Sequence, residues 1–277
     1  GTLPFPVEGA RRILAPGENV VPQGSEARQG DRLLEPGTRL APDQIALAAA
    51  CGVLSLPVYA QPRVAILATG DELVEPSTQE ENSEGAAGNE AVPIQSHRIY
   101  NSNSYALAAL VHQCGGIPLR QRPALDQLDD LAASIRQGLK AAPLLLLTGG
   151  VSMGKFDFVK EVLAGMGAEF FFAGVRMQPG KPVIFGRVPI RKGRPARYFF
   201  GLPGNPVSAM VTVRVFVQPL LAALAGERHW QPPTALAKLT TEIRSKPGLT
   251  RFLSAHRDAS QLLATVTPVP TRGSGDL

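Results

Sequence analysis

The middle of the chain alternates short apolar runs with longer amphipathic stretches, the pattern of strands and helices that follow one another in an α/β domain. The runs are rich in Val, Leu, Ile and Phe and are bounded by Gly, Pro or polar residues, as buried strands are. This order predicts three layers, with helices on both faces of a mostly parallel sheet. We expect strands at 63–69, 117–121, 144–148, 170–175, 183–187 and 197–200, and helices at 102–113, 125–140, 156–165 and 206–226.

Two details depart from simple alternation. The runs 183–187 and 197–200 have no helix between them, and the basic turn at Lys192-Gly193 predicts a hairpin. Pro219 falls inside the last helix, where its ring and its missing N–H predict a kink or a break.

The two ends of the chain lack this alternation. A short helix is expected between Pro42 and Gly52. We therefore expect a partial β-rich N-terminal segment at 1–60, the α/β domain at 61–229 and a small, partial β domain at 230–277. Short strand candidates lie at 11–14, 18–21 and 31–34 and again at 234–243, 251–256 and 262–266.

Two further stretches bear on the organisation of the chain. Residues 75–97 turn to Glu, Asn, Ser and Gly without periodicity, which predicts a surface loop. The chain begins with Gly1 rather than Met and stops at Leu277 without a closing element, so we expect a fragment or a processed chain.

Composition narrows the class of partner. The net charge is +5, from 28 Lys and Arg against 23 Asp and Glu, which favours an acidic partner such as a phosphorylated small molecule. Nucleic acid is disfavoured, because the basic clusters at 187–197 and 244–257 lack an RNA-binding aromatic signature and a basic helix. Cys51 and Cys114 lack metal or redox spacing. With no signal peptide and no apolar span of about 18 residues free of charge, we expect a cytoplasmic protein without membrane attachment.

Three glycine-rich loops follow the predicted strands or lie close behind them: Thr148–Gly154, Gln178–Pro182 and Gly201–Pro206. Glycines let backbone N–H groups approach a ligand, and loops at the carboxyl ends of parallel strands suit an anion. In the third loop, Asn205 is a favoured N-cap and Pro206 suits the first helical position. Each loop alone could be a tight turn without a ligand, but three in one sheet predict a shared site.

Acidic residues follow the same strands. Asp71 and Glu72 come directly after the first predicted strand, Asp126 lies near the start of a helix, and Asp157 follows the first glycine loop. Carboxylates at one edge of the sheet could hold a hard cation such as Mg²⁺ beside a bound phosphate. The alternative is that they cap helices or lie in solvated turns.

Basic and polar side chains complete the candidates. Lys181 lies between Gly180 and Pro182 in a rigid turn and is the best candidate for a direct contact with an anion, with Arg176 and Lys155 as weaker ones. Asn103 could face a ligand while Ser102 caps the helix. Neither Ser152 nor Ser208 has a nucleophile-elbow pattern, and the histidines lack metal-ligand spacing.

Together these motifs resemble one family. Thr69–Leu73, Ile99–Asn103, Thr148–Gly154, Met177–Pro182 and Gly201–Ser208 are similar, in this order, to the motif set of the MoeA proteins and the gephyrin E domain, the molybdopterin molybdenumtransferases. The resemblance implies a MoaB/Mog-like molybdopterin-binding domain, a C-terminal β-barrel and a homodimer. It also implies ligation of molybdate to adenylylated molybdopterin with Mg²⁺, giving molybdenum cofactor and AMP.

The resemblance assigns roles residue by residue. It implies catalytic roles for Glu72, Asp126, Asp157 and Lys181 and a metal site at Asp71, Glu72 and Asp157. It implies that the pterin and its phosphate contact Thr69, Gly70, Asn103, Thr148, Gly149, Gly150, Ser152, Pro179, Gly180, Pro203, Gly204, Asn205, Pro206 and Ser208.

The chain departs from the family at Asn101, where the family usually has an acid, and in the long acidic loop before it. The alternative function is a scaffold that binds molybdopterin without catalysis, although a pure binder has no need of Asp71, Glu72 and Asp157 together. A dinucleotide-binding domain is disfavoured, because no GxGxxG follows the first strand.

Overall fold

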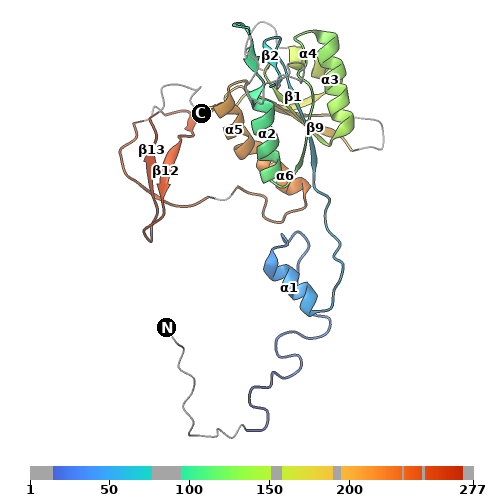
Figure 1. Cartoon of the computed structure of the whole chain (residues 1–277), viewed down its shortest axis with the longest axis vertical. Helices are drawn as coiled ribbons and strands as arrows, with labels where there is room; N and C mark the ends of the chain where they lie inside the picture. Colours follow the sequence, from blue (N-terminus) through green and yellow to red (C-terminus); the bar gives the residue numbers. More distant parts are fainter. Residues whose placement is uncertain are drawn as a thin grey trace, which may run out of the picture. The chain divides into compact units, whose positions relative to one another are not determined.

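The computed structural model describes residues 15–76, 95–150, 158–189, 195–232, 234–244 and 247–270. The chain divides into two compact units, Gly1–Leu54 and Ser55–Leu277. Figure 1 shows both units and labels some of their helices and strands.

In the described part of the first unit, residues 15–54, the structure has one helix, α1 (Pro42–Ala50), as the sequence predicts. Pro42 occupies its first turn, the Gln44 side chain accepts a hydrogen bond from the Ala41 N–H at 3.0 Å, and Gly52 ends it with φ +71°. These contacts satisfy backbone groups that the helix itself leaves unpaired.

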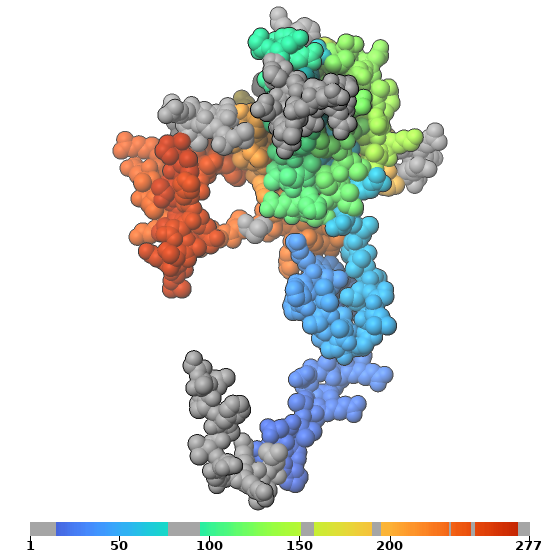
Figure 2. Space-filling model, in the orientation of Figure 1, coloured from blue at the N-terminus to red at the C-terminus, as the bar shows by residue number. Residues whose placement is uncertain are grey.

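The prediction of a β-rich N-terminal segment is wrong for the residues that the structure describes. The strand candidates at 18–21 and 31–34 form turns and irregular backbone, and the candidate at 11–14 lies outside the described residues. A strand needs a partner to pair with, and turns at Gly17, Gly24 and Gly30 interrupt this stretch with positive φ. Figure 2 shows the dark blue part of the chain as a narrow string of atoms, in agreement with its largely exposed side chains.

The second unit is built on a six-stranded sheet in the order β4-β1-β5-β9-β8-β6. The first four strands in this order are parallel, whereas β8 runs antiparallel to both β9 and β6. The predicted mostly parallel sheet and the antiparallel pairing of 183–187 with 197–200 are therefore confirmed. The bounds are β1 (Arg63–Ala68), β4 (Ile117–Arg120), β5 (Leu144–Thr148), β6 (Glu169–Ala173), β8 (Ile184–Val188) and β9 (Arg197–Leu202).

Helices cover both faces of this sheet, which gives the three predicted layers (Figure 1). The side chains of β5 alternate between the faces: Leu144 and Leu146 pack on one, Leu145 and Leu147 on the other. The first face packs against α2 (Ser102–Gln113), α5 (Pro206–Thr212), the π-helical turn η1 (Val213–Val217) and α6 (Gln218–Leu224), and the second against α3 (Leu128–Ala141) and α4 (Phe158–Gly165).

The last helical run, Pro206–Leu224, changes from α-helical to π-helical winding before Pro219. A π-helical turn over Val213–Val217 leads into α6, in which Pro219 occupies the first turn. The predicted break is therefore a local change of winding, because a proline without an N–H cannot continue the α-helical ladder. This run is long and apolar enough to cross a membrane by length and composition alone. However, Ala209, Val213 and Leu221 are buried against the sheet, so its apolar face belongs to the core of the domain.

Short strands complete the second unit. β2 (Leu73–Val74) pairs in parallel with β3 (Ile99–Tyr100), and β11 (Thr250–Arg251) pairs in parallel with β7 (Met177–Gln178). Within 234–270, the described residues form a three-stranded sheet rather than a closed barrel. Its strands are β10 (Lys238–Leu239), β12 (Ala255–Asp258) and β13 (Thr265–Pro268).

Candidate functional site

The predicted glycine loops come together at one edge of the sheet. Because β1, β5 and β9 are parallel, the residues that follow them emerge at the same edge, where the N–H of Thr69 donates to the carbonyl of Thr148 at 2.9 Å. β8 runs the other way, and the pairing of Ile184 with Gly201 brings the loop before β8 to this edge too. Residues 151–157, which include the predicted site residues Ser152 and Asp157, lie outside the described residues.

Two glycines let the first loop pack against the end of β1. Gly149 and Gly150 have φ of +89° and +61°. A Cβ on Gly149 would lie 2.3 Å from the carbonyl oxygen of Thr69, and a Cβ on Gly150 would lie 2.8 Å from its hydroxyl oxygen. Only glycine allows both the backbone conformation and this close approach.

Asn103 joins α2 to the other two loops. Its Nδ2 lies 3.0 Å from the hydroxyl oxygen of Thr148 and 2.7 Å from the carbonyl oxygen of Gly204. The Thr148 hydroxyl donates to the carbonyl of Pro203 at 3.3 Å, so it accepts from Asn103. Both partners of Asn103 therefore require a donor, which fixes the orientation of its amide and leaves Oδ1 as an acceptor.

Two polar atoms at this edge are buried without a partner. Four such side-chain atoms occur among the described residues, and the hydroxyl oxygen of Thr69 and Oδ1 of Asn103 are two of them. Thr69 is only 3% exposed. A buried polar atom without a partner costs about 1–3 kcal/mol, so a ligand group that pairs with these atoms would remove a cost that the folded protein carries.

The third loop directs the start of α5 toward the same edge. Asn205 is the N-cap, and its Oδ1 accepts from the backbone N–H and the hydroxyl of Ser208, both at 3.1 Å. Pro206 occupies the first turn, as predicted. Ser208 is buried, and its hydroxyl serves the cap.

The predicted acids gather at the end of β1. The carboxylate of Asp71 accepts from the backbone N–H of Asp126 at 3.0 Å. Partial burial, and then the charges of Asp71 and Glu72, raise the pKa of Asp126 above its ordinary value. Gly70, with φ +146°, leaves room for the Glu72 carboxylate, which would lie 2.6 Å from a Cβ at this position.

A cleft of about 290 Å³ adjoins these acids. Its lining residues are Asp126, Leu131, Gly150, Phe158 and Val159. No three Asp, Glu, His or Cys side chains in the described ranges are grouped so that they could hold a metal ion. Since Asp157 lies outside those ranges, the metal site at Asp71, Glu72 and Asp157 stays a prediction.

Basic side chains surround a second cleft, of about 380 Å³. Lys160, Arg176 and Lys181 line it, and none of the acidic residues that the structure describes does so. The loop that carries Lys181 is held by a hydrogen bond of 2.9 Å from the Val175 N–H to the Lys181 carbonyl oxygen. Gly180 packs against α5 in this loop: its φ is +104° and its Cβ would lie 2.8 Å from the hydroxyl oxygen of Thr212.

The start of α4 therefore lies between the cleft beside the acids and the basic cleft. Phe158 and Val159 line the cleft beside the acids, and Lys160 lines the basic cleft. Lys160 is not among the site residues predicted from the sequence, because a lysine on an amphipathic helix carries no signal that distinguishes it from a solvated one.

The prediction that Ser102 caps the helix at 102–113 is wrong. Asn101, rather than Ser102, is the N-cap: its Oδ1 accepts from the Ser104 N–H at 3.2 Å. Asn101 is 1% exposed, and its Nδ2 donates to the carboxylate of Glu75 at 2.6 Å. The predicted surface loop at 75–97 therefore begins with a residue that is tied to the fold, while 77–94 lie outside the described residues.

The fold and this edge define a class of protein, a three-layer α/β domain whose glycine loops, acids and lysines meet at the carboxyl ends of parallel strands. Residues 65–223 match the family described as a probable molybdopterin binding domain, and residues 5–52 match the MoeA N-terminal region (domain I and II). The first match covers more than half of the chain, so this chain belongs to the molybdopterin binding domain family.

Named relatives and solved structures agree with this family. The chain is 36% identical over 231 residues to a molybdopterin molybdenumtransferase of Nostoc sp., covering 83% of this chain and 49% of the relative. It is 34% identical over 243 residues to the protein of that name from Haemophilus influenzae, covering 87% and 53%. A MoeA structure from Pyrococcus horikoshii has a TM-score of 0.70 at 25% identity, covering 96% of this chain and 59% of the other. The chain spans about half the length of the curated relatives that it matches.

Proposed function

We propose that this protein is a molybdopterin molybdenumtransferase of the cytoplasm, which joins molybdate to adenylylated molybdopterin and gives molybdenum cofactor and AMP. The observation that carries the proposal is the single edge of the sheet at which glycine loops, acids and lysines meet. Relatives that share about a third of their aligned residues with this chain bear the name of this enzyme.

The glycine loops and the basic side chains would hold the phosphates of the substrate. Backbone N–H groups at Gly149 and Gly150 and at the start of α5 can donate to phosphate oxygens. Lys181, which lines the basic cleft, would contact the same anion or the molybdate. The buried acceptors of Thr69 and Asn103 would pair with donors of the substrate.

The acids would hold Mg²⁺. Carboxylate oxygens are the ligands that Mg²⁺ prefers, and the raised pKa of Asp126 fits a bound cation, because a positive charge would relieve the repulsion from Asp71 and Glu72. Asp71 and Glu72, with Asp157 as predicted, would be the ligands. When bound, the ion would neutralise charge that develops as the phosphoanhydride breaks. Asp126 would orient Asp71 through its backbone N–H, and its carboxylate would have the catalytic role that the family resemblance implies.

The homodimer that the family resemblance implies is part of the proposal. Since the chain spans about half of its relatives' length, a complete site can include residues from outside it. The test of function should therefore use the full-length protein.

The test is to incubate the protein with adenylylated molybdopterin and Mg²⁺, with and without molybdate, and to measure AMP. AMP that forms only with molybdate supports the transferase. Tight binding of the pterin without AMP release supports the alternative, a scaffold that keeps the pocket without the chemistry. No binding contradicts both.

A further inference from the structure

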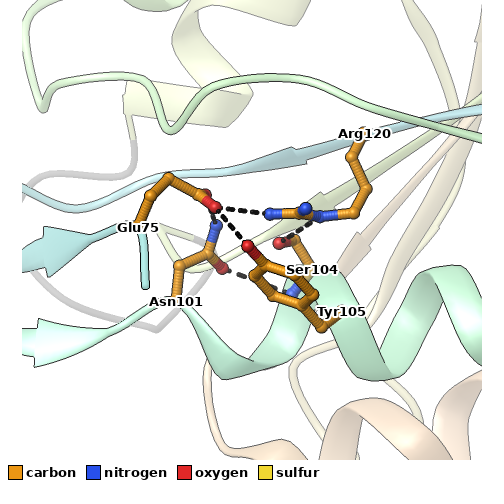
Figure 3. A network of polar contacts seen from close by, with 5 residues as sticks. All are labelled: Glu75, Asn101, Ser104, Tyr105 and Arg120. Atoms are coloured by element: carbon orange, nitrogen blue, oxygen red, sulfur yellow. Dashed lines mark hydrogen bonds and ion pairs between the residues drawn. The ribbon is translucent and has the colours of Figure 1, made fainter. Parts of the chain in front are cut away.

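A polar network that the proposed function does not use lies beside the start of α2 (Figure 3). Its centre is the carboxylate of Glu75, directly after β2. This carboxylate accepts hydrogen bonds from Nδ2 of Asn101 at 2.6 Å, from the hydroxyl of Tyr105 at 3.0 Å and from the guanidinium of Arg120 at 2.6 Å. Three donors on one carboxylate, one of them a guanidinium, favour the ionised form of Glu75.

Arg120, the last residue of β4, ties the network to the helix a second time. Its Nε donates to the hydroxyl of Ser104 at 3.0 Å, and its guanidinium lies 3.4 Å from the ring centre of Tyr105. A planar guanidinium can make an ion pair, a second hydrogen bond and a stacking contact at once, which a lysine cannot do. Glu75 and Arg120 thus both contact the first turn of α2, through Asn101, Ser104 and Tyr105.

The same turn carries Asn103. Asn101, Ser104 and Tyr105 share one side of the helix by their i, i+3 and i+4 spacing, and this side faces Glu75 and Arg120. Asn103 lies on a different side and reaches Thr148 and Gly204 in the glycine loops. The rotation and height of this single turn therefore decide where Oδ1 of Asn103 lies.

We infer that Glu75 and Arg120 are positioning residues: they fix the first turn of α2 so that Oδ1 of Asn103 accepts a hydrogen bond from an N–H donor on the heterocycle of the bound substrate. This inference rests on the proposed function, since it takes the pterin or the adenine as the source of the donor. The buried Oδ1 atom, which has no partner among the described residues, supports it, because a donor on the substrate would remove the cost of an unpaired buried acceptor.

A double-mutant cycle on ligand affinity tests the inference. Dissociation constants for molybdopterin and, separately, for AMP are measured with the full-length protein, Glu75→Gln, Asn103→Ala and the double variant. We expect each single substitution to weaken the same one of the two ligands by about fivefold to tenfold, the loss of one hydrogen bond. If Glu75 acts through Asn103, the double variant binds within about twofold of Asn103→Ala. The ligand that responds identifies the donor as pterin or adenine.

Two controls separate positioning from general stability. Glu169→Gln removes an ion pair of 2.7 Å with Arg187 at the other side of the sheet and should leave both affinities unchanged. Tyr105→Phe keeps the ring under Arg120 and removes one of the three donors, so it should weaken binding less than Glu75→Gln. If Glu75→Gln does not fold, Tyr105→Phe takes its place in the cycle.

The inference is overturned if the effects of Glu75→Gln and Asn103→Ala multiply in the double variant. It is also overturned if Glu75→Gln lowers the melting temperature without changing either affinity. The double-mutant cycle measures binding and not turnover. If the double variant binds like Asn103→Ala but the unsubstituted protein releases no AMP, only the proposed transferase activity is contradicted. Failure of the unsubstituted protein to bind either ligand would contradict both proposals.

Discussion

The carboxylate of Asp71 accepts a hydrogen bond from the backbone N–H of Asp126 at 3.0 Å, across 55 positions of sequence. This contact links the loop after β1 to the loop before α3 and brings two acidic residues together. Acids that repel one another are destabilising unless a cation or a proton lies between them. The proximity of Asp71 and Asp126 is therefore better explained by a bound cation than by a contribution to the stability of the fold.

We predict that Asp126→Asn abolishes most of the activity without lowering stability. The pKa of Asp126 is raised, so ionising it costs the folded protein more than the unfolded chain, and this loss of stability sets in as the pH rises past the ordinary pKa. Removing the charge should leave the melting temperature at pH 7 unchanged or higher, while molybdate-dependent AMP release falls at least about tenfold. A lower melting temperature with unchanged AMP release would assign Asp126 to the fold instead.

Gly149→Ala should destabilise the protein by more than about 2 kcal/mol, because the new methyl group meets the Thr69 carbonyl oxygen and alanine disfavours this positive φ. The matched control is Gly165→Ala at the end of α4, where no atom lies within 4 Å of the added carbon and φ is not positive. That change should stabilise by about 0.5–1 kcal/mol. Urea unfolding of the two variants checks both signs, and equal effects would contradict the close packing of the loop on β1.

We predict that Glu75 makes the stability of the folded protein depend on pH. Partial burial works to raise its pKa, but the hydrogen bonds from Asn101, Arg120 and Tyr105 outweigh it, and the pKa of Glu75 is lowered. The network therefore stabilises the folded state above the ordinary pKa of a glutamate, about 4.3, and this contribution is lost as the pH falls through the lower, folded-state value. Unfolding of Glu75→Gln and of the unsubstituted protein between pH 7 and pH 3 should differ most above pH 5 and converge at the acid end. A constant difference would contradict an ionised Glu75.

We predict that an acid in place of Asn101 destabilises the folded protein. Asn101→Asp keeps the oxygen that caps α2 but replaces the donor to Glu75, 2.6 Å away, by a second carboxylate. We expect a loss of about 1–3 kcal/mol at pH 7, partly recovered at pH 4. Asn205→Asp, which changes the N-cap of α5 in the same way, should cost less than about 0.5 kcal/mol, since Asn and Asp are equally good caps. Chemical unfolding at both pH values checks the comparison.

The sequence predicts the centre of the fold well because local pattern and burial agree there. Every residue of Leu144–Thr148 is buried, so this strand is a continuous apolar run, and the helix at Ser102–Gln113 ends where Gly115 and Gly116 follow. The gathering of the loops then follows from parallel pairing, which places the ends of β1, β5 and β9 together.

The features that the sequence could not predict depend on contacts between segments that are far apart in the chain, and no local pattern encodes such contacts. The candidate strands at 18–21 and 31–34 have the right residue types, but a strand forms only where another segment pairs with it. The contact of Glu75 with Asn101 joins residues 26 positions apart across a stretch without periodicity. Likewise, Lys160 becomes part of the basic cleft only through the approach of α4 to the loop of Lys181.

The proposed function requires above all that the edge of the sheet at Thr69, Gly149, Lys181 and Asn205 binds the pterin phosphate. A crystal structure of the full-length protein with adenylylated molybdopterin tests it most directly. Phosphate oxygens should lie within hydrogen-bond distance of the Gly149 and Gly150 backbone N–H groups and near Lys181, and an N–H of the heterocycle should donate to Asn103 Oδ1. Density for the ligand away from this edge, for example on the three-stranded sheet of 234–270, would contradict a phosphate site at these loops.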